Sequence, residues 1–320
     1  MFRPLSALIM DFQPDPITVR VGFAALTLLL SWRLWKFTIR PRLNPDEPKE
    51  LPYWIPCHAS SFFLDFNGVI EYGRQYFSPS REPFAIVVGG QTIYVATSPE
   101  DINYVWRNSK TISMDPITMD MYTLGGISEN SRKAMFEKHA AARYNAGQGK
   151  PLTPTEKVID LHHQQLYRGP RLDSLIQDRM LPSICKALDM TDSGNQSILS
   201  RSENSVVISL HNLCVHIFIT KETEAYFGPT ILNKSPELIN AFLDWELCSW
   251  KFLFQLPDVL AQDMVKTKRT ITDTFANYYR LPRSERPGSI FFVDALEDML
   301  REVGLTESEM GHFTLLHYWA

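Results

Sequence analysis

Cysteine thiols are the side chains of this sequence with the widest chemical range, because a thiolate binds metals and acts as a nucleophile. The 320 residues contain four cysteines, which lie far apart and form no C-x-x-C pair. They are Cys57, Cys185, Cys214 and Cys248. This spacing predicts neither a zinc site nor a disulfide framework, so we expect four reduced thiols in a cytosolic body.

Histidines occur in three close pairs, which raises the question of a metal site. The pairs are His162 with His163, His211 with His216, and His312 with His317. The members of the last two pairs are five positions apart, whereas two histidine ligands on one helix face are four apart. We therefore expect structural or surface histidines and no metal. The sequence also lacks a Gly-rich phosphate loop, a G-x-S-x-G motif and a Cys/His pair of the nucleophile type.

The composition is that of a globular protein. Hydrophobic residues make up 44% and charged residues 21% of the chain, which suits one large or two ordinary domains with ample core. The formal net charge is −4, and Lys and Arg are scattered. These features give no electrostatic footprint for nucleic acid, so we expect no partner of that class.

An apolar run at residues 17–35 is the strongest organising feature. Residues 21–32 are uncharged, and the whole run has about the length that a bilayer crossing needs, roughly 20 residues. Two tryptophans lie where an interfacial aromatic belt is expected. The side chains that we expect to anchor the chain are Val21, Leu26, Leu30, Trp32 and Trp35.

Three other interpretations of this run were weighed against a membrane span. A cleaved signal peptide would have a basic start and a small-residue cleavage site, whereas Asp11 and Asp15 precede the run. An interfacial helix would need a polar face, which residues 23–30 lack. The third interpretation, a buried core helix, is compatible with the sequence because the uncharged part of the run is short. The span is favoured over all three.

The charges around the run predict its orientation. Basic residues crowd its C-terminal side: Arg33, Lys36, Arg40 and Arg42. Because positive residues stay in the cytosol, residues 1–16 should be lumenal and the body should face the cytosol from the endoplasmic reticulum membrane, with a single span. Residues 36–56 are basic and proline-rich, which predicts a stiff, extended hinge in front of a body at 57–320.

The body is predicted to be mainly α-helical with a small β-hairpin. Two β-rich runs at 84–88 and 91–96 are joined by Gly89-Gly90, which indicates a tight turn. Ser98-Pro99 then begins a helix expected to bury Ile102, Val105 and Trp106. Residues 61–76 also carry a helical apolar stripe.

Two later segments are less regular. Residues 110–130 hold several methionines without steady periodicity and are expected to form either a flexible binding lip or irregular surface. Residues 206–219 are apolar nearly all round and are expected to form a helix buried on every side. Further helices are expected after Thr153, along 260–278, before Gly304 and after the capping box that Thr306 and Glu309 form.

This order of parts resembles the start of a microsomal cytochrome P-450, a haem-thiolate monooxygenase. Short phrases resemble the fungal branch related to sterol and bile-acid-type hydroxylases and prostacyclin synthase. They are AYFGP at 225–229, WKF at 250–252 with LP at 256–257, YYRLP at 278–282 with Arg286, and EDMLREVG at 297–304. The resemblance covers most of residues 52–320.

By this resemblance the intact protein would bind haem iron, take electrons from an NADPH-cytochrome reductase and oxidise a lipophilic, sterol- or terpenoid-like molecule, in a role such as fungal secondary metabolism. The helix after Thr306 would be the start of the distal helix over the haem, so we expect the chain to end within that helix, as an inactive fragment of a truncated cytochrome P-450 fold. None of the four cysteines lies in the family's F-x-x-G-x-x-x-C-x-G motif. Two E-x-x-R matches, at 71–74 and 129–132, are expected to be ordinary helix ion pairs.

The resemblance also suggests binding residues, although it gives no catalytic ones. Arg132 or Lys133 would contact a haem propionate. The residues that would border the substrate entrance are Met114, Met121, Leu124, Trp245, Trp250 and Phe254. The alternative to an enzyme is a non-catalytic, membrane-tethered helical protein that binds a lipid or a partner.

Overall fold

The computed structural model describes residues 16–54, 57–78, 81–108, 111–147, 149–191 and 197–319. The predicted lumenal segment therefore lies outside the described residues except for Pro16, and so do the last two residues of the predicted hinge. The chain divides into two compact units, Met1–Ser113 and Met114–Ala320.

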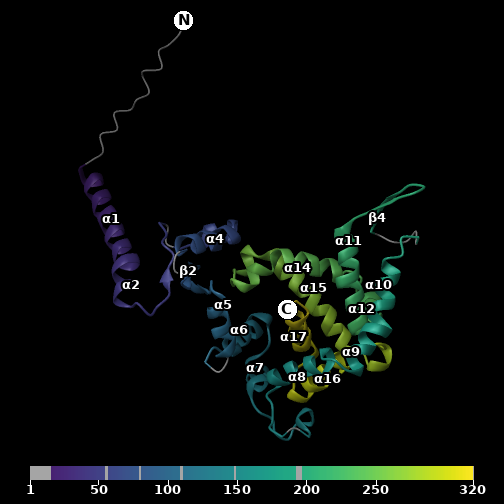
Figure 1. Ribbon diagram of the computed structural model, residues 1–320. Helices are drawn as coiled ribbons and strands as arrows, with labels where there is room; N and C mark the ends of the chain where they lie inside the picture. The colour runs from purple at the N-terminus through teal and green to yellow at the C-terminus, as the bar shows by residue number, and fades with distance from the viewer. Residues whose placement is uncertain are drawn as a thin grey trace. The chain divides into compact units, whose positions relative to one another are not determined.

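The first unit begins with one long helix (Figure 1, purple). Helix α1 spans Pro16–Leu34 and continues through a π-helical turn, Trp35–Ile39, into α2, Arg40–Leu43. Together these 28 residues are long and apolar enough to cross a membrane by length and composition, and no residue of α1 is buried. This is the only helix with these properties among the described residues.

The predicted hinge is shorter than expected. Helical geometry continues to Leu43, and Pro41 follows directly after the π-helical turn, where the regular i→i−4 hydrogen bonding is already interrupted. The extended chain that follows contacts the end of the long helix. The Lys36 amine donates to the Tyr53 hydroxyl at 2.6 Å and lies 3.0 Å from the Glu50 carboxylate.

A three-stranded sheet forms the core of the first unit. Strand β2, Phe84–Val88, pairs in parallel with β1, Lys49–Glu50, and in antiparallel with β3, Gln91–Val95. The predicted Gly-Gly turn is confirmed: Gly89 and Gly90 have φ values of 57° and 87°, which glycine adopts without strain.

Helices α3 and α4 replace the single predicted helix. They span Ala59–Leu64 and Phe66–Tyr76, and Asp65 separates them because its carboxylate accepts the Gly68 N–H at 2.8 Å and caps α4. The helix after the hairpin is confirmed as α5, Pro99–Arg107, with Ser98 as its N-cap. The expected burial of Ile102, Val105 and Trp106 is wrong, since 46%, 42% and 79% of these residues is exposed.

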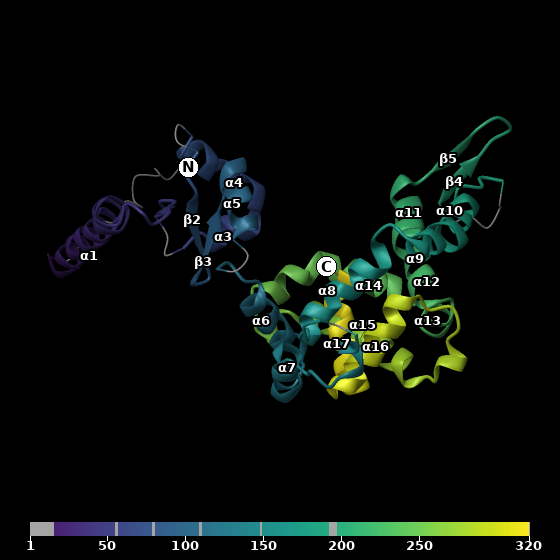
Figure 2. The same cartoon turned by 60° about the horizontal axis from the view of Figure 1, so that its bottom comes forward.

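The second unit is a helical bundle with one small hairpin. Its first helices are α6, Asp115–Gly125, α7, Glu129–Phe136, α8, Pro154–Leu166, α9, Pro170–Ser174, and α10, Leu181–Ala187. Its later helices are α11, Leu210–Val215, α12, Glu222–Phe227, α13, Thr230–Lys234, α14, Leu238–Leu253, α15, Gln262–Arg280, α16, Phe291–Val303, and α17, Glu307–Trp319. The hairpin pairs β4, Ile198–Arg201, with β5, Val206–Ile208, and lies beside α10 and α11 (Figure 2).

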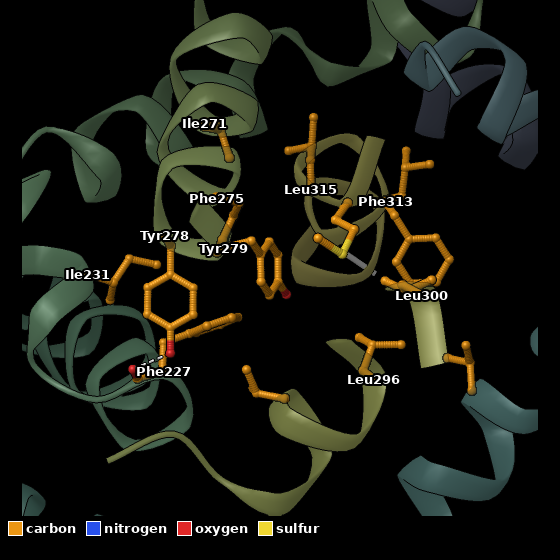
Figure 3. Packing of buried hydrophobic residues seen from close by; sticks show 14 of the residues in the cluster. Phe227, Ile231, Ile271, Phe275, Tyr278, Tyr279, Leu296, Leu300, Phe313 and Leu315 are labelled. Carbon is orange, nitrogen blue, oxygen red and sulfur yellow. Dashed lines mark hydrogen bonds between the residues drawn. The ribbon is translucent and has the colours of Figure 1, made fainter. Parts of the chain in front are cut away.

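Helices α15 and α17 pack closely at the centre of this bundle. Gly311 permits the contact, because a Cβ atom there would lie 2.4 Å from the Thr272 carbonyl oxygen and 2.9 Å from the Ala276 nitrogen. Around this crossing lie buried residues of α15, α16 and α17, among them Ile271, Phe275, Leu296, Phe313 and Leu315 (Figure 3). The Tyr278 hydroxyl donates to the Phe227 carbonyl oxygen at 2.8 Å and ties α15 to the end of α12.

Two predictions about this unit are wrong. The methionine-rich segment contains an ordered helix, α6, because Asp115-Pro116 begins a helix and Gly126 ends it with a φ of 103°. Residues 206–219 form a short strand, α11 and part of a π-helical turn, and Leu213 is the buried residue of that stretch. Pairing with β4 draws residues 206–208 into a hairpin, which their β-branched side chains favour.

Local capping signals are confirmed. Thr153 and Glu156 form a capping box at α8, and Thr306 and Glu309 form another at α17. Gly304 ends α16 with a φ of 95°. A π-helical turn, Leu175–Met180, lies directly before α10, whose first turn contains Pro182.

Candidate ligand pocket

An apolar pocket of about 280 Å³ lies inside the second unit. It is lined by residues of α8, α12, α14, α15, α16 and α17 and of the π-helical turn His216–Lys221. Its walls are mostly aromatic or aliphatic: Phe218, Phe227, Phe242, Phe292, Val293 and Leu296. A small apolar cavity with a few polar groups is the usual form of a small-molecule site.

Four of the hydroxyl groups that line the pocket form two hydrogen-bonded pairs. The Thr223 and Tyr318 hydroxyls lie 2.5 Å apart and join α12 to α17. The Tyr279 and Thr314 hydroxyls lie 3.0 Å apart and join α15 to α17. These pairs satisfy polar groups that would otherwise be costly to bury, and they hold α17 in place as one wall of the pocket.

Two histidines form the polar end of the pocket. The ring centroids of His162, on α8, and His317, on α17, are 6.4 Å apart, and His162 packs on Phe292 at 4.1 Å. The Nε2 atom of His317 is shielded from solvent and has no hydrogen-bond partner among the described residues. A buried nitrogen in this state is a group that a ligand can satisfy.

Burial controls the charge of these groups. Burial, together with the nearby His162 ring, lowers the pKa of His317 to about 4, so this imidazole is neutral at pH 7. Burial also lowers the pKa of His162, with a further contribution from His163. Burial raises the pKa of Glu222, which also lines the pocket. No lysine or arginine lines the pocket in the described part of the chain.

A π-helical turn shapes the pocket wall. Residues His216–Lys221 form this turn between α11 and α12, and Phe218 and Ile219 within it line the pocket. One extra residue per turn shifts the side chains that follow, and such turns are frequent at functional sites. The larger hollow of about 750 Å³ between α8 and α16 is lined by charged side chains such as Arg143, Lys157 and Glu302, and it is less suited to an apolar ligand.

The described residues do not fit a haem-thiolate centre. Such a centre needs a cysteine facing a cavity. None of the four cysteines lines the pocket: Cys248 is buried with its sulfur 3.4 Å from the Thr267 hydroxyl, and Cys185 is exposed. Cys57 and Cys214 are partly buried elsewhere. The thiols are free, as expected, and the described residues contain no cluster of metal-ligating side chains.

The predicted haem-propionate residues lie away from the pocket. The Arg132 guanidinium donates to the Thr123 hydroxyl, and Lys133 forms an exposed ion pair with Glu129 at 2.6 Å. Neither lines the pocket. Glu71 and Arg74 form an exposed pair at 3.1 Å, as expected for the first E-x-x-R match, whereas Glu129 of the second match pairs with Lys133.

The predicted entrance residues do not form one site. Trp245 is fully buried in the core, so its indole borders no opening in this unit. Met121 and Leu124 pack against the same core from α6. Met114 is 66% exposed and Trp250 is 37% exposed, while Phe254 caps the end of α14. None of these six residues lines the pocket.

Sequence reasoning missed the residues that do form the pocket. In the sequence, His162 is paired with His163, and His317 is paired with His312. In the structure, the rings of His162 and His317 lie beside each other. Glu222 carried no recognisable pattern. The one sequence feature that could have indicated these residues is the presence of polar side chains in otherwise apolar helices such as α17.

We compared the chain with known protein families and with individual proteins. No family model matches the chain. The chain is similar to "Cytochrome P450 monooxygenase poxD" from Penicillium oxalicum, with 20% identity over 267 residues. The match covers 82% of this chain and 50% of the relative, so the chain spans about half the length of that relative. The chain is thus similar to a cytochrome P450 monooxygenase.

Proposed function

We propose that this chain is a membrane-anchored homologue of cytochrome P450 monooxygenases and that its second unit binds a lipophilic small molecule. The similarity to a P450 monooxygenase over most of the chain supports the family, and the apolar pocket carries the binding function. The long apolar helix at the N-terminus supports the anchor. The body then faces the cytosol from the endoplasmic reticulum, with residues 1–16 in the lumen.

Insertion of oxygen would need two further components: a cysteine that ligates the haem iron, and electrons from a reductase. We propose this activity only for a protein that has both. The described residues of this chain offer a binding pocket and no thiolate beside it. The closer relation to sterol and bile-acid-type hydroxylases, and a sterol- or terpenoid-like substrate, stay predictions from the sequence phrases.

The absence of a cysteine from the described lining of the pocket favours a second function. An apolar pocket with no thiolate among its described lining residues suits a non-catalytic, membrane-tethered protein that binds a lipid. The two proposed functions differ in whether the protein binds haem. In both, the lipophilic molecule binds in the same pocket.

Binding is tested with the neutral fluorescent probe N-phenyl-1-naphthylamine and the full chain in lipid nanodiscs, with empty nanodiscs as the blank. We expect saturable binding that Ile219→Trp, at the pocket wall, weakens strongly. Leu199→Trp on the exposed β4 strand is the matched control, since Leu199 is 65% exposed. Equal binding of the probe by both variants would show that the pocket is not the binding site.

Haem binding is tested with chain produced in haem-supplemented cells. A thiolate-type spectrum under carbon monoxide that is lost in one Cys→Ser variant would support catalysis by this chain alone. Probe binding without any haem absorption would support the non-catalytic function, and we expect this result from the isolated chain because no thiolate faces the pocket.

A further inference from the structure

We propose that the pocket selects a neutral lipophilic alcohol and that the Nε2 atom of His317 holds its hydroxyl group. This inference rests on the proposed function, because it names the chemistry of the ligand that the pocket takes. His317 is then a specificity-determining residue.

The first step is the state of the Nε2 atom. It belongs to a pocket-lining side chain, is shielded from solvent and has no hydrogen-bond partner among the described residues. Leaving a buried polar atom unpaired destabilises a protein, so native structures usually provide a partner. The lining hydroxyls of Thr223, Tyr318, Tyr279 and Thr314 are already paired with one another. The Tyr226 hydroxyl also lines the pocket but is not bonded to Nε2, which has no partner among the described residues. We assign the open position at Nε2 to a group of the ligand.

The second step is the chemistry of that group. A neutral imidazole nitrogen either donates or accepts, according to the tautomer. A hydroxyl does both, so it satisfies Nε2 in either tautomer. A carboxylate suits the pocket poorly, because no lysine or arginine lines it in the described residues and Glu222 lies on its wall. An ammonium group at Nε2 would have to lose its hydration beside two uncharged rings, and Glu222 is the one lining side chain among the described residues that could pair with it.

The third step is the shape of the rest of the pocket. Phe313 packs 4.2 Å from the His317 ring, and Phe292 packs on His162, so aromatic side chains surround the polar end. Apart from Glu222 and the lining hydroxyl groups, the remaining walls are apolar, and the pocket encloses about 280 Å³, near the lower end of the range for drug-sized ligands. One hydroxyl on a small hydrocarbon body matches this distribution of one polar end and apolar walls.

The test uses four molecules with similar hydrocarbon bodies and different head groups: geraniol, myrcene, geranic acid and geranylamine. Each displaces N-phenyl-1-naphthylamine from the full chain in nanodiscs, with empty nanodiscs as the blank. We expect geraniol to bind about three- to tenfold more tightly than myrcene, which is the range for one neutral hydrogen bond. The acid and the amine should bind more weakly than geraniol.

The His317→Phe variant should lose the preference for geraniol and keep the affinity for myrcene. His163→Phe is the matched control, because His163 stacks on Tyr167 and does not line the pocket. Circular dichroism reports whether each variant is folded, and His317→Asn, which keeps a polar side chain, replaces His317→Phe if the latter unfolds.

Each outcome decides something different. Tight binding of myrcene with no preference for geraniol would overturn the inference and leave the proposed function standing. Stronger binding of the acid or the amine would overturn the hydroxyl assignment. If none of the four molecules and no probe binds, both the inference and the proposed function fail.

Discussion

Ser128 donates its backbone N–H to the Glu309 carboxylate at 3.1 Å, across 181 positions of sequence. Ser128 is the N-cap of α7, and Glu309 belongs to the capping box of α17. In a local capping box, the glutamate three residues after the N-cap would receive this N–H, but that position in α7 is Ser131. Glu309 therefore caps its own helix and completes the N-terminus of a second one.

Replacing Glu309 with alanine should destabilise the second unit by roughly 2–4 kcal/mol, because two backbone N–H groups and one hydroxyl lose a charged acceptor. Urea unfolding of the full chain, followed by circular dichroism, measures the change. Glu203→Ala, in the exposed turn between β4 and β5, is the control and should change stability little. Equal effects of the two variants would show that the shared cap is energetically unimportant.

Acid titration gives a second reading of Glu309. Burial opposes ionisation, but hydrogen bonds from Ser128, Thr306 and Ser131 prevail and lower its pKa from 4.5 to about 2. Because the folded pKa lies below the unfolded one, the stabilisation is complete above pH 4.5 and is lost as pH falls towards 2. Glu309→Gln should flatten the stability curve in this window, and an unchanged slope would argue against the assignment.

Gly311→Ala should destabilise the same unit by at least about 2 kcal/mol, because the new methyl group would meet backbone atoms of Thr272 and Ala276 that cannot rotate away. Thermal unfolding measures the effect. Gly149→Ala is the matched control, since a Cβ atom there meets nothing within 4 Å. A neutral Gly311→Ala variant would mean that α15 and α17 are not packed as closely as described.

Glu297 is the buried centre of an ion-pair network. Its carboxylate lies 2.5 Å from the Arg286 guanidinium, and only 3% and 1% of the two side chains is exposed. Glu297→Ala should cost about 3–5 kcal/mol, because it leaves Arg286 charged and buried without its partner. The double variant Arg286→Met/Glu297→Leu should recover much of this loss.

Asp298→Ala is the control for the network. Asp298 pairs with Arg283 at 2.6 Å but is 67% exposed, so its removal should cost less than about 1 kcal/mol. Chemical unfolding of all the variants in one buffer gives the comparison. A double variant as unstable as Glu297→Ala would refute the argument from uncompensated charge.

His317, whose Nε2 atom is shielded from solvent, should make the protein sensitive to mild acid. The pKa of His317 is about 4 in the folded chain and 6.5 is its ordinary value, so the unfolded chain takes up a proton first as pH falls. The stabilisation is present above pH 6.5 and declines towards pH 4, by about 3 kcal/mol.

Stability measured between pH 7 and pH 4 tests this expectation. His317→Gln should reduce the slope. Burial also lowers the pKa values of His162 and His312, so part of the slope should remain in the variant. A slope identical to that of the unmodified chain would show that His317 is not neutral and buried.

The membrane anchor gives a topological prediction. A glycosylation acceptor engineered near Met1 should be modified in microsomes, whereas one engineered after Pro56 should not, because basic residues hold the body in the cytosol. Leu26→Arg, near the middle of the span, should reduce alkali-resistant membrane association, since a charge there opposes insertion by about 2.5–3.5 kcal/mol. The reverse glycosylation pattern would overturn the orientation.

Local signals in the sequence determined much of the secondary structure. The Gly89-Gly90 turn, the Ser98 cap, the helix start after Thr153 and the C-cap at Gly304 are all predicted and all present. Each depends on groups within about four positions of one another, so no knowledge of the rest of the chain is needed. The mainly helical fold class and the apolar N-terminal helix were predicted on the same basis.

The tertiary structure decided the features that depend on distant residues. Residues 206–208 form a strand because β4 pairs with them, and Trp245 is a core residue because α14 turns it inward. His162 and His317 meet although 155 positions separate them, and Ser128 meets Glu309 across 181. No periodicity encodes such meetings, because they follow from how α8, α16 and α17 share one core. Local sequence patterns determined most of the helices, and the packing of those helices created the pocket.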